Sequence, residues 1–329
     1  MSKPRKIMLL LTLLAGLCGW TAPVVHALER VSIRLHWVHQ AQFAGYYLAQ
    51  DLGLYQAAGL EVELRPGGPG QPSPLDDLAQ GQVDFATSWL SEALVRRSQG
   101  APVVNLAQII QRSALLLVTF SDTGIESVRD LTGRRVGLWR DYFAIPARAL
   151  FSRLKIEVQE VDQNVSMSPF LSRAVAAATA MRYNEYHQLY QAGVDPEQLI
   201  IFDFAEMGLN FPEDGIYATA QTWRQRPDVC RRFVDATLEG WRRAMADPKA
   251  ALEAVMRRVE QANLATNRRH QQWMLESMGM LITYRTGDEG IGILNPGDLA
   301  LVNRVLREQQ FLDQTVAYDD FAMPAWRRP

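Results

Sequence analysis

Cysteine is nearly absent from this chain. Its 329 residues include only Cys18 and Cys230. We expect Cys18 to be removed with an amino-terminal leader, so the remaining protein has one thiol and no internal disulfide. Its stability must then come from a hydrophobic core. A chain of about 300 residues is long enough to build such a core and suggests two domains.

Lysine is equally scarce, and arginine supplies most of the positive charge. The only lysines are Lys3, Lys6, Lys155 and Lys249. Without the first 27 residues, which carry three basic and no acidic side chains, the chain has 31 basic and 36 acidic residues. This acidic balance favours solubility and gives no reason to expect nucleic acid as a partner.

The sequence has no apolar run of the roughly 20 residues that a transmembrane helix needs. The run 7–17 is shorter, follows a basic start and precedes Val25-His26-Ala27, which is the order of a secretory signal peptide. We therefore expect export to the periplasm, with cleavage after Ala27. Leu17 stands before Cys18 where a lipoprotein box has a small residue, so we expect a soluble product.

Motifs for catalysis and for metal binding are also lacking. His36 and His39 have no HExxH or other metal-binding spacing around them, and Ser88 has no Gly-x-Ser-x-Gly elbow. We therefore expect no catalytic residue, no metal and no cofactor.

Short β-type runs alternate with helical ones along the chain, which predicts an α/β fold with largely parallel sheets. We expect two lobes with a cleft between them. Residues 28–118 and 217–329 form lobe 1, 119–216 form lobe 2, and strands near 115–120 and 214–219 cross between them. The helices after residue 228 are expected to pack on lobe 1.

The segment 31–70 is the most informative part of the sequence. It reads as strand, helix, strand and glycine loop, and it contains Phe43-Ala44-Gly45-Tyr46-Tyr47 and Gly67-Gly68-Pro69-Gly70. This unit resembles the opening of type 2 periplasmic binding proteins, in the branch that captures the pyrimidine precursor of thiamine. The segments 183–186 and 211–215 resemble the second-domain signature of the same family. The resemblance implies a two-lobed fold that closes on a ligand.

Open α/β sheets bind ligands at the carboxyl ends of their strands, where polar and aromatic residues gather in this chain. Large rings at such positions can stack on a planar ligand, although aromatic residues also cover sheet edges. Asn184 and Glu185 offer the donors and acceptors that an aminopyrimidine needs, or else they simply open a helix. With the positions that the resemblance adds, the candidate ligand contacts are Trp37, Gln40, Tyr46, Gly67, Gly68, Ser88, Trp89, Trp139, Arg140, Tyr183, Asn184, Glu185 and Asp214.

Three functions are compatible with the resemblance. The first is the solute-binding protein of an ABC importer, a monomer that delivers a small planar ligand to a membrane permease. The second is a receptor for a separate membrane sensor kinase. The third is an enzyme like the thiamine pyrimidine synthase of this fold family, which uses pyridoxal phosphate on a lysine. Export, the missing cysteine cluster and the position of Lys155 and Lys249 outside the candidate site argue against the enzyme.

The ligand itself stays open at this stage. Related branches bind sulfonates, nitrate, riboflavin or pyrimidines on one scaffold. Trp139-Arg140-Asp141-Tyr142 also replaces the small loop expected in the family. An arginine there suits a carboxylate, phosphate or sulfonate.

Overall fold

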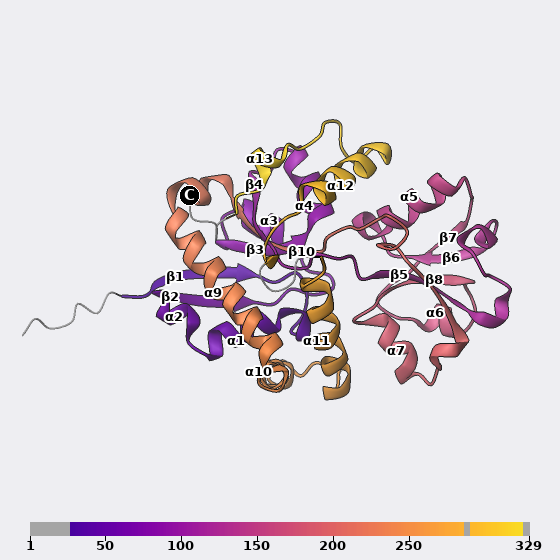
Figure 1. Ribbon diagram of the computed structural model, residues 1–329, viewed down its shortest axis with the longest axis horizontal. Helices are drawn as coiled ribbons and strands as arrows, with labels where there is room; N and C mark the ends of the chain where they lie inside the picture. Colours follow the sequence, from indigo (N-terminus) through magenta and orange to yellow (C-terminus); the bar gives the residue numbers. More distant parts are fainter. Residues whose placement is uncertain (1–26, 286–289, 325–329) are drawn as a thin grey trace, which may run out of the picture.

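The chain forms two lobes, each built around a five-stranded sheet, in a computed structural model that describes residues 27–285 and 290–324. Figure 1 shows the lobes side by side. The expected leader and all but the last residue of its cleavage motif lie outside the described residues. The strands are β1 (Glu29–Arg34), β2 (Leu60–Arg65), β3 (Phe85–Trp89), β4 (Val103–Gln108), β5 (Leu115–Phe120), β6 (Arg135–Leu138), β7 (Gln159–Asp162), β8 (Ala177–Met181), β9 (Leu199–Asp203) and β10 (Asp214–Thr219).

Helices connect the strands and follow the last of them. The α-helices are α1 (Ala44–Asp51), α2 (Leu54–Ala57), α3 (Pro74–Ala79), α4 (Leu90–Ser98), α5 (Ile145–Leu154), α6 (Ser168–Leu171), α7 (Glu185–Gln191), α8 (Ala220–Gln225), α9 (Pro227–Ala246), α10 (Pro248–Gln261), α11 (Arg268–Ile282), α12 (Pro296–Glu308) and α13 (Tyr318–Phe321). The 3₁₀ helices are η1 (Ala41–Phe43), η2 (Ser121–Thr123), η3 (Val128–Leu131), η4 (Asp141–Ala144) and η5 (Pro196–Gln198).

Both sheets have the same strand arrangement. The strand order is β2-β1-β3-β10-β4 in the first lobe and β7-β6-β8-β5-β9 in the second. In each sheet one strand is antiparallel to its neighbours, β10 in the first and β5 in the second. Each of these antiparallel strands immediately follows a segment that comes from the other lobe. The predicted two-lobed α/β fold is confirmed.

The chain crosses between the lobes in segments 109–114 and 204–213. We expected strands near 115–120 and 214–219 to cross between the lobes, with residues up to 118 in lobe 1 and 119–216 in lobe 2. Instead β5 pairs with β8 and β9 in the second sheet, and β10 pairs with β3 and β4 in the first sheet from Asp214 onward. The residues of β5 are all buried, so their sequence does not show which sheet they join. The segments are held together at Glu213, whose Oε1 accepts from the Ala114 N–H at 2.5 Å, and at Asn210, whose Oδ1 accepts from the Ser113 N–H at 2.9 Å.

The carboxyl-terminal helices do not all stay on the first lobe. Helices α9 and α10 pack on α1, whereas α11 also contacts α7 and α12 also contacts α5 in the second lobe. The expectation that every helix after 228 packs on lobe 1 is therefore too simple. Helix α11 lies beside the crossing segments, and the Gln111 N–H donates to the Leu281 carbonyl at 3.1 Å.

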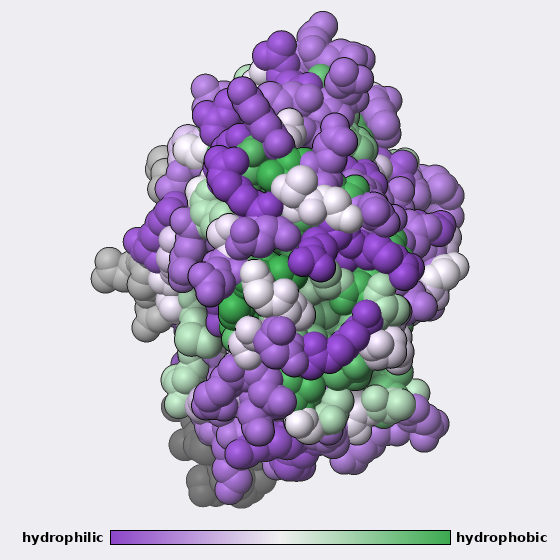
Figure 2. Space-filling model, turned by 90° about the vertical axis from the view of Figure 1, so that its right-hand side faces the viewer, coloured by the Kyte–Doolittle hydropathy of each residue, from purple (hydrophilic) through white to green (hydrophobic). Residues whose placement is uncertain are grey.

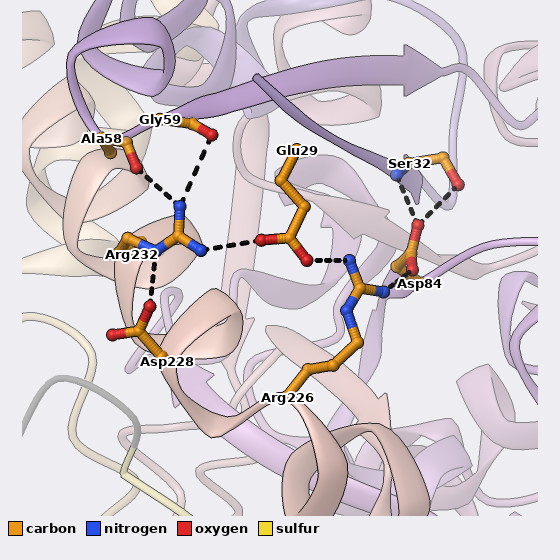
Figure 3. Close-up of polar contacts among 8 residues, drawn as sticks. All are labelled: Glu29, Ser32, Ala58, Gly59, Asp84, Arg226, Asp228 and Arg232. Atoms are coloured by element: carbon orange, nitrogen blue, oxygen red, sulfur yellow. Dashed lines mark hydrogen bonds and ion pairs between the residues drawn. The ribbon is translucent and has the colours of Figure 1, made fainter. Parts of the chain in front are cut away.

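An ion-pair network ties the start of the first sheet to α9 (Figure 3). Glu29 on β1 accepts from Arg226 at 3.0 Å and from Arg232 at 2.8 Å. Arg226 also reaches Asp84, which in turn accepts from the Ser32 N–H at 2.8 Å. The two arginines hold the pKa of Glu29 below its ordinary value, although its partial burial alone would raise that pKa. The network fixes the edge of the lobe opposite the carboxyl ends of β1 and β3.

The face at the end of the second lobe is largely hydrophilic, with hydrophobic side chains at its centre (Figure 2). These hydrophobic side chains are interrupted by hydrophilic ones, as on a surface that faces water. Among the residues that the structure describes, none of the helices has the length and apolar character required to span a membrane.

Candidate functional site

A cavity of about 500 Å³ lies between the lobes. This volume is within the range of roughly 300–1,000 Å³ seen for small-molecule sites. The first lobe supplies the ends of β1 and β3, the segment before η1 and the loop after β2, and the second supplies the ends of β6, β7 and β8. The lining residues are His36, Trp37, Gln40, Gln42, Pro69, Gly70, Trp89, Trp139, Arg140, Asp141, Phe143, Gln163, Asn164, Val165, Met181, Tyr183, Asn184 and Glu185.

Aromatic rings from both lobes form much of the wall. Trp89 from the first lobe meets Phe143 from the second edge to face, with centroids 4.5 Å apart, and Trp139 stands 6.3 Å from Phe143. Trp37 lines the cavity from the end of β1 and is half-buried. These rings offer apolar faces to a planar guest from both sides of the cleft.

Gln42 connects the two walls. Its Nε2 donates to Asp214 Oδ2 at 2.9 Å and to the Tyr183 hydroxyl of the second lobe at 3.3 Å. Its Oε1 accepts from Gln40 Nε2 at 2.5 Å. The short helix η1 begins between these glutamines, so the backbone turn at 41–43 fixes where both side chains enter the cavity.

The wall of the second lobe centres on Glu185, which is buried at the start of α7. Its Oε2 accepts from the Met181 N–H at 3.0 Å and its Oε1 from Asn184 Nδ2 at 2.7 Å. Burial raises the pKa of Glu185 to about 7 against these lowering contacts. The carboxyl group therefore sits between its acid and its carboxylate form near neutral pH.

Asp214 pairs with His36 behind the cavity wall, and their Oδ1 and Nδ1 atoms lie 3.0 Å apart. Burial alone would lower the pKa of His36, but the Asp214 carboxylate and, more weakly, Glu92 raise that pKa above its ordinary value. Glu213 next to Asp214 is fully buried, and its burial raises its pKa well above the ordinary value. Burial thus acts against a second negative charge beside the His36–Asp214 pair.

Two cavity-lining side chains each have a buried polar atom with neither a hydrogen-bond partner nor an ion pair among the described residues. These atoms are the indole Nε1 of Trp89, a donor, and Oε1 of Gln163, an acceptor. Both side chains line the cavity and are more than nine-tenths buried. Both atoms are covered by protein, and Gln163 Oε1 lies beside Gly137, so neither is open to a guest in the cavity.

The structure brings together eight of the predicted contacts on this cavity, namely Trp37, Gln40, Trp89, Trp139, Arg140, Tyr183, Asn184 and Glu185. Arg140 stands at an exposed position and pairs with Asp162. Its charge is therefore already matched within the protein.

The structure places the other five predicted contacts away from the wall. Tyr46 is 1% exposed and packs against Trp241 in the core, because it lies on the buried side of α1. Ser88 donates to Glu92 at 2.6 Å, and Asp214 lies behind His36 and Gln42. In the glycine loop Pro69 and Gly70 line the cavity, whereas Gly67 and Gly68 do not.

Gly67 has a structural reason to be glycine. A Cβ at this position would lie 2.5 Å from the Leu35 carbonyl oxygen, so a side chain would push the loop away from β1. The Gly67 N–H also donates to the Trp37 carbonyl at 2.9 Å. The glycine therefore holds the backbone at Trp37 in place without contacting the cavity.

Several lining residues were not among the predicted contacts. His36 and Gln42 flank predicted contacts and follow the same strand end, so the strand-end rule reaches them. Phe143, Gln163, Asn164 and Val165 come from η4 and from the loop after β7, a short edge strand with an exposed, polar sequence. Their positions depend on the fold of the second lobe.

Comparison with known proteins agrees with this geometry. Residues 40–251 match the family model described as NMT1/THI5 like. The chain belongs to the NMT1/THI5-like family. Among similar proteins, the riboflavin-binding protein RibY of Chloroflexus aurantiacus is 27% identical over 280 residues, which cover 80% of this chain and 76% of RibY. The formylaminopyrimidine-binding protein of Halalkalibacterium halodurans is 24% identical over 269 residues, which cover 78% of this chain and 79% of that protein.

Solved structures share the fold of this NMT1/THI5-like chain. The periplasmic aliphatic sulphonate binding protein SsuA of Escherichia coli superposes with a TM-score of 0.69 at 13% identity and covers 89% of this chain and 91% of SsuA. At this identity the likeness concerns the fold alone. The resemblance stated from segments 31–70, 183–186 and 211–215 is thus confirmed at the level of the family.

Proposed function

We propose that this chain is the extracytoplasmic solute-binding protein of an ABC importer, and that its lobes close on a small planar heteroaromatic ligand. The observation that supports this most is the composition of the cavity wall. Rings from both lobes surround a space whose wall also carries the polar side chains of Gln40, Asn184 and Glu185. A nitrogen heterocycle with an amino group can form hydrogen bonds with these side chains while its faces stack on the rings.

Charge in the cavity favours a neutral or weakly basic ligand over an anion. Glu185 on the wall is acidic, Asp214 behind the wall pairs with His36, and Arg140 pairs with Asp162. An incoming sulfonate or phosphate would face Glu185 without a free arginine fork to bind it. A pyrimidine precursor of thiamine fits this environment, because its ring nitrogens accept and its amino group donates hydrogen bonds.

The size of the cavity is consistent with a single heteroaromatic ring. At about 30 Å³ of liquid volume per molecule, the space corresponds to roughly 17 water molecules. An aminopyrimidine with its substituents occupies part of this space, and a few waters fill the rest. A three-ring flavin would use the space more fully and would need the mouth near Val165 to stay open.

The two remaining lysines support a binding role over pyridoxal phosphate chemistry. Lys155 is an exposed residue at the end of α5 and Lys249 is exposed in the first turn of α10, and neither lines the cavity. Schiff-base formation in the cleft would need a lysine there.

Calorimetric titration with three ligands tests the proposal. The ligands are 4-amino-5-hydroxymethyl-2-methylpyrimidine, riboflavin and an aliphatic sulfonate, and native mass spectrometry of protein from its own periplasm identifies any co-purified molecule. We expect micromolar or tighter binding of the aminopyrimidine. Preference for the sulfonate would contradict the proposal. Loss of uptake of the labelled ligand when the gene is deleted tests the importer role.

A further inference from the structure

Two consecutive side chains of helix α11 contact residues that support the two walls of the cavity. Gln271 Oε1 accepts from the Ala41 N–H at 2.7 Å, at the turn between Gln40 and Gln42 in the first lobe. His270 Nε2 lies 3.0 Å from Oδ1 of Asn184, which holds Glu185 in the second lobe. His270 and Gln271 do not line the cavity, and both are buried.

A second histidine continues this chain of contacts. His187 on α7 has its Nδ1 2.9 Å from Nδ1 of His270. The His187 ring stacks on Trp273 of α11 at 4.8 Å, and Trp273 Nε1 donates to the Arg182 carbonyl at 2.9 Å. Helices α7 and α11, from opposite sides of the cleft, are thus joined by consecutive polar and aromatic contacts.

The hydrogen-bond partners determine which ring nitrogens carry protons. Asn184 Nδ2 donates to Glu185, so Oδ1 faces His270 and must accept. His270 therefore carries its proton on Nε2, and its Nδ1 accepts from the Nδ1–H of His187. A second proton on His270 alone would force the His187 proton from Nδ1 to Nε2, and protonation of both rings would place two N–H groups against each other and break the chain.

We propose that His270 and Gln271 are positioning residues that hold Asn184 and Ala41, and through them Glu185 and Gln42, in the ligand-binding arrangement before a ligand arrives. The hydrogen bond between neutral His187 and neutral His270 holds α7 against α11 in this arrangement, and we call this pair the clasp. The inference rests on the proposed function and goes beyond it, because it assigns a role in binding to side chains that touch no ligand. Preorganised sites need such support, since a contact held loosely loses affinity to ordering costs.

The surroundings of the clasp favour its neutral form. Burial and, to a smaller degree, the adjacent His187 lower the pKa of His270 to about 4. Burial and Arg269 likewise lower the pKa of His187. Of the charged groups nearby, Glu185 faces Asn184 from α7 and Arg268 on α11 is paired with Glu253 of α10. The clasped state is therefore fully favoured above about pH 6.5 and is lost as pH falls toward 4.

Nuclear magnetic resonance of the histidine rings in the ligand-free protein tests the clasp directly. We expect His270 to be the Nε2–H tautomer, with a titration midpoint well below 6.5, and its signals to be assigned by their loss in His270→Gln. A midpoint near 6.5 with mixed tautomers would overturn the proposal. This measurement needs no ligand, so it tests the His187–His270 pair even if the protein binds none of the three test ligands and the proposed function fails.

Affinity for the aminopyrimidine tests the positioning role. His270→Gln keeps a donor that reaches Asn184 and does not titrate, so we expect affinity within twofold of the wild type at pH 7.5 and a weaker loss of affinity on going to pH 5. His270→Leu removes the donor and Gln271→Leu removes the acceptor for Ala41, and each should weaken binding at least fivefold. His39→Gln, on a half-buried histidine that contacts Tyr47 away from the cleft, is the matched control. If both leucine variants melt at lower temperature but bind like the wild type, the two residues are merely structural and the proposal is wrong.

Discussion

Trp89 and Phe143 meet edge to face from opposite lobes, with ring centroids 4.5 Å apart and ring planes at 76°. Trp89 is 5% exposed at the end of β3, whereas Phe143 is half-buried on η4. Such pairs contribute about 0.5–1.5 kcal/mol beyond the area they bury. Since each ring belongs to a different lobe, this energy favours the closed arrangement of the lobes and supports the wall of the cavity at once.

Phe143→Ala should therefore weaken ligand binding by about three- to tenfold, which is the fold-change that the energy of an aromatic pair implies. The half-buried position of Phe143 means that the melting temperature should fall only slightly. Calorimetric titration beside melting curves measures both effects. Tyr142→Phe, which keeps a ring at the neighbouring half-buried position, is the control and should bind normally. Normal affinity with a clearly lower melting temperature in Phe143→Ala would show that Phe143 only stabilises its lobe.

Trp37→Ala should lower affinity at least tenfold while it leaves the melting temperature of the ligand-free protein nearly unchanged. The Trp37 ring lines the cavity and is half-buried, and the contact that Trp37 makes with Gly67 uses its backbone carbonyl, which alanine retains. Titration calorimetry with the aminopyrimidine checks the first effect and scanning calorimetry the second. Retained affinity together with lower stability would show that Trp37 covers the edge of the sheet and does not contact the ligand.

Titration calorimetry and scanning calorimetry should give a different result for Glu185→Ala. From sequence, Glu185 reads as a ligand contact whose loss spares stability. In the structure Glu185 is 5% exposed and accepts from the Met181 N–H, so its removal leaves that buried donor unpaired. Glu185→Ala should lower both affinity and stability.

The sequence predicted eight of the lining residues, and most of these lie at the carboxyl ends of strands. Trp37 and Trp89 stand at the ends of neighbouring parallel strands of one sheet, so they had to lie near one another once the strands were recognised. Trp139 follows a strand of the second sheet, and it reaches the same cavity because the two lobes face each other. The strand-end rule says nothing about η4 or the loop after β7. Phe143 and Gln163 reach the wall through tertiary folding, which periodicity does not encode.

Two errors have clear physical causes. Strand β5 is antiparallel and buried on both faces, so its apolar sequence fits either sheet. Tyr46 belongs to the motif that carries the family resemblance, yet it is a core residue on α1. A resemblance reports that a residue type recurs and does not separate packing from ligand contact. Only the closeness of α1 to α9 assigns this motif to the core.

Gly45→Ala should lower the stability of the first lobe by about 1–3 kcal/mol, the usual cost of overpacking a core. A Cβ on Gly45 would lie 2.3 Å from the Trp241 ring, and a Cβ on Gly240 would lie 2.2 Å from the Gly45 carbonyl oxygen. Helices α1 and α9 therefore approach closely because both positions are glycine. Denaturant unfolding measures the loss. Gly279→Ala is the control, because a Cβ there meets no other atom within 4 Å and alanine favours a helix. Equal stability of Gly45→Ala and the wild type would mean that Trp241 moves aside at little cost.

Glu185 should make the stability of the protein fall as pH rises from about 4.5 to 7. Burial raises the pKa of Glu185 from 4.5 to about 7, so the folded state holds a proton that the unfolded chain has released in this range. Its contribution is full below pH 4.5 and is lost as pH rises through 7. One pKa unit corresponds to about 1.4 kcal/mol, which makes this contribution on the order of 3 kcal/mol.

Glu185→Gln cannot ionise and keeps an oxygen for the Met181 N–H, so its unfolding free energy should fall less than that of the wild type between pH 4.5 and 8. The fall is reduced and not abolished, because burial also raises the pKa of Glu213, whose contribution to stability is likewise lost as pH rises. Glu253→Gln is the control with the opposite pH dependence. Arg268 lowers the pKa of Glu253, so the contribution of Glu253 to stability is lost as pH falls and not as pH rises. Urea unfolding at a series of pH values compares the three proteins. Parallel curves for the wild type and Glu185→Gln would show that Glu185 titrates at its ordinary pKa, and that the cavity presents a full carboxylate to its ligand.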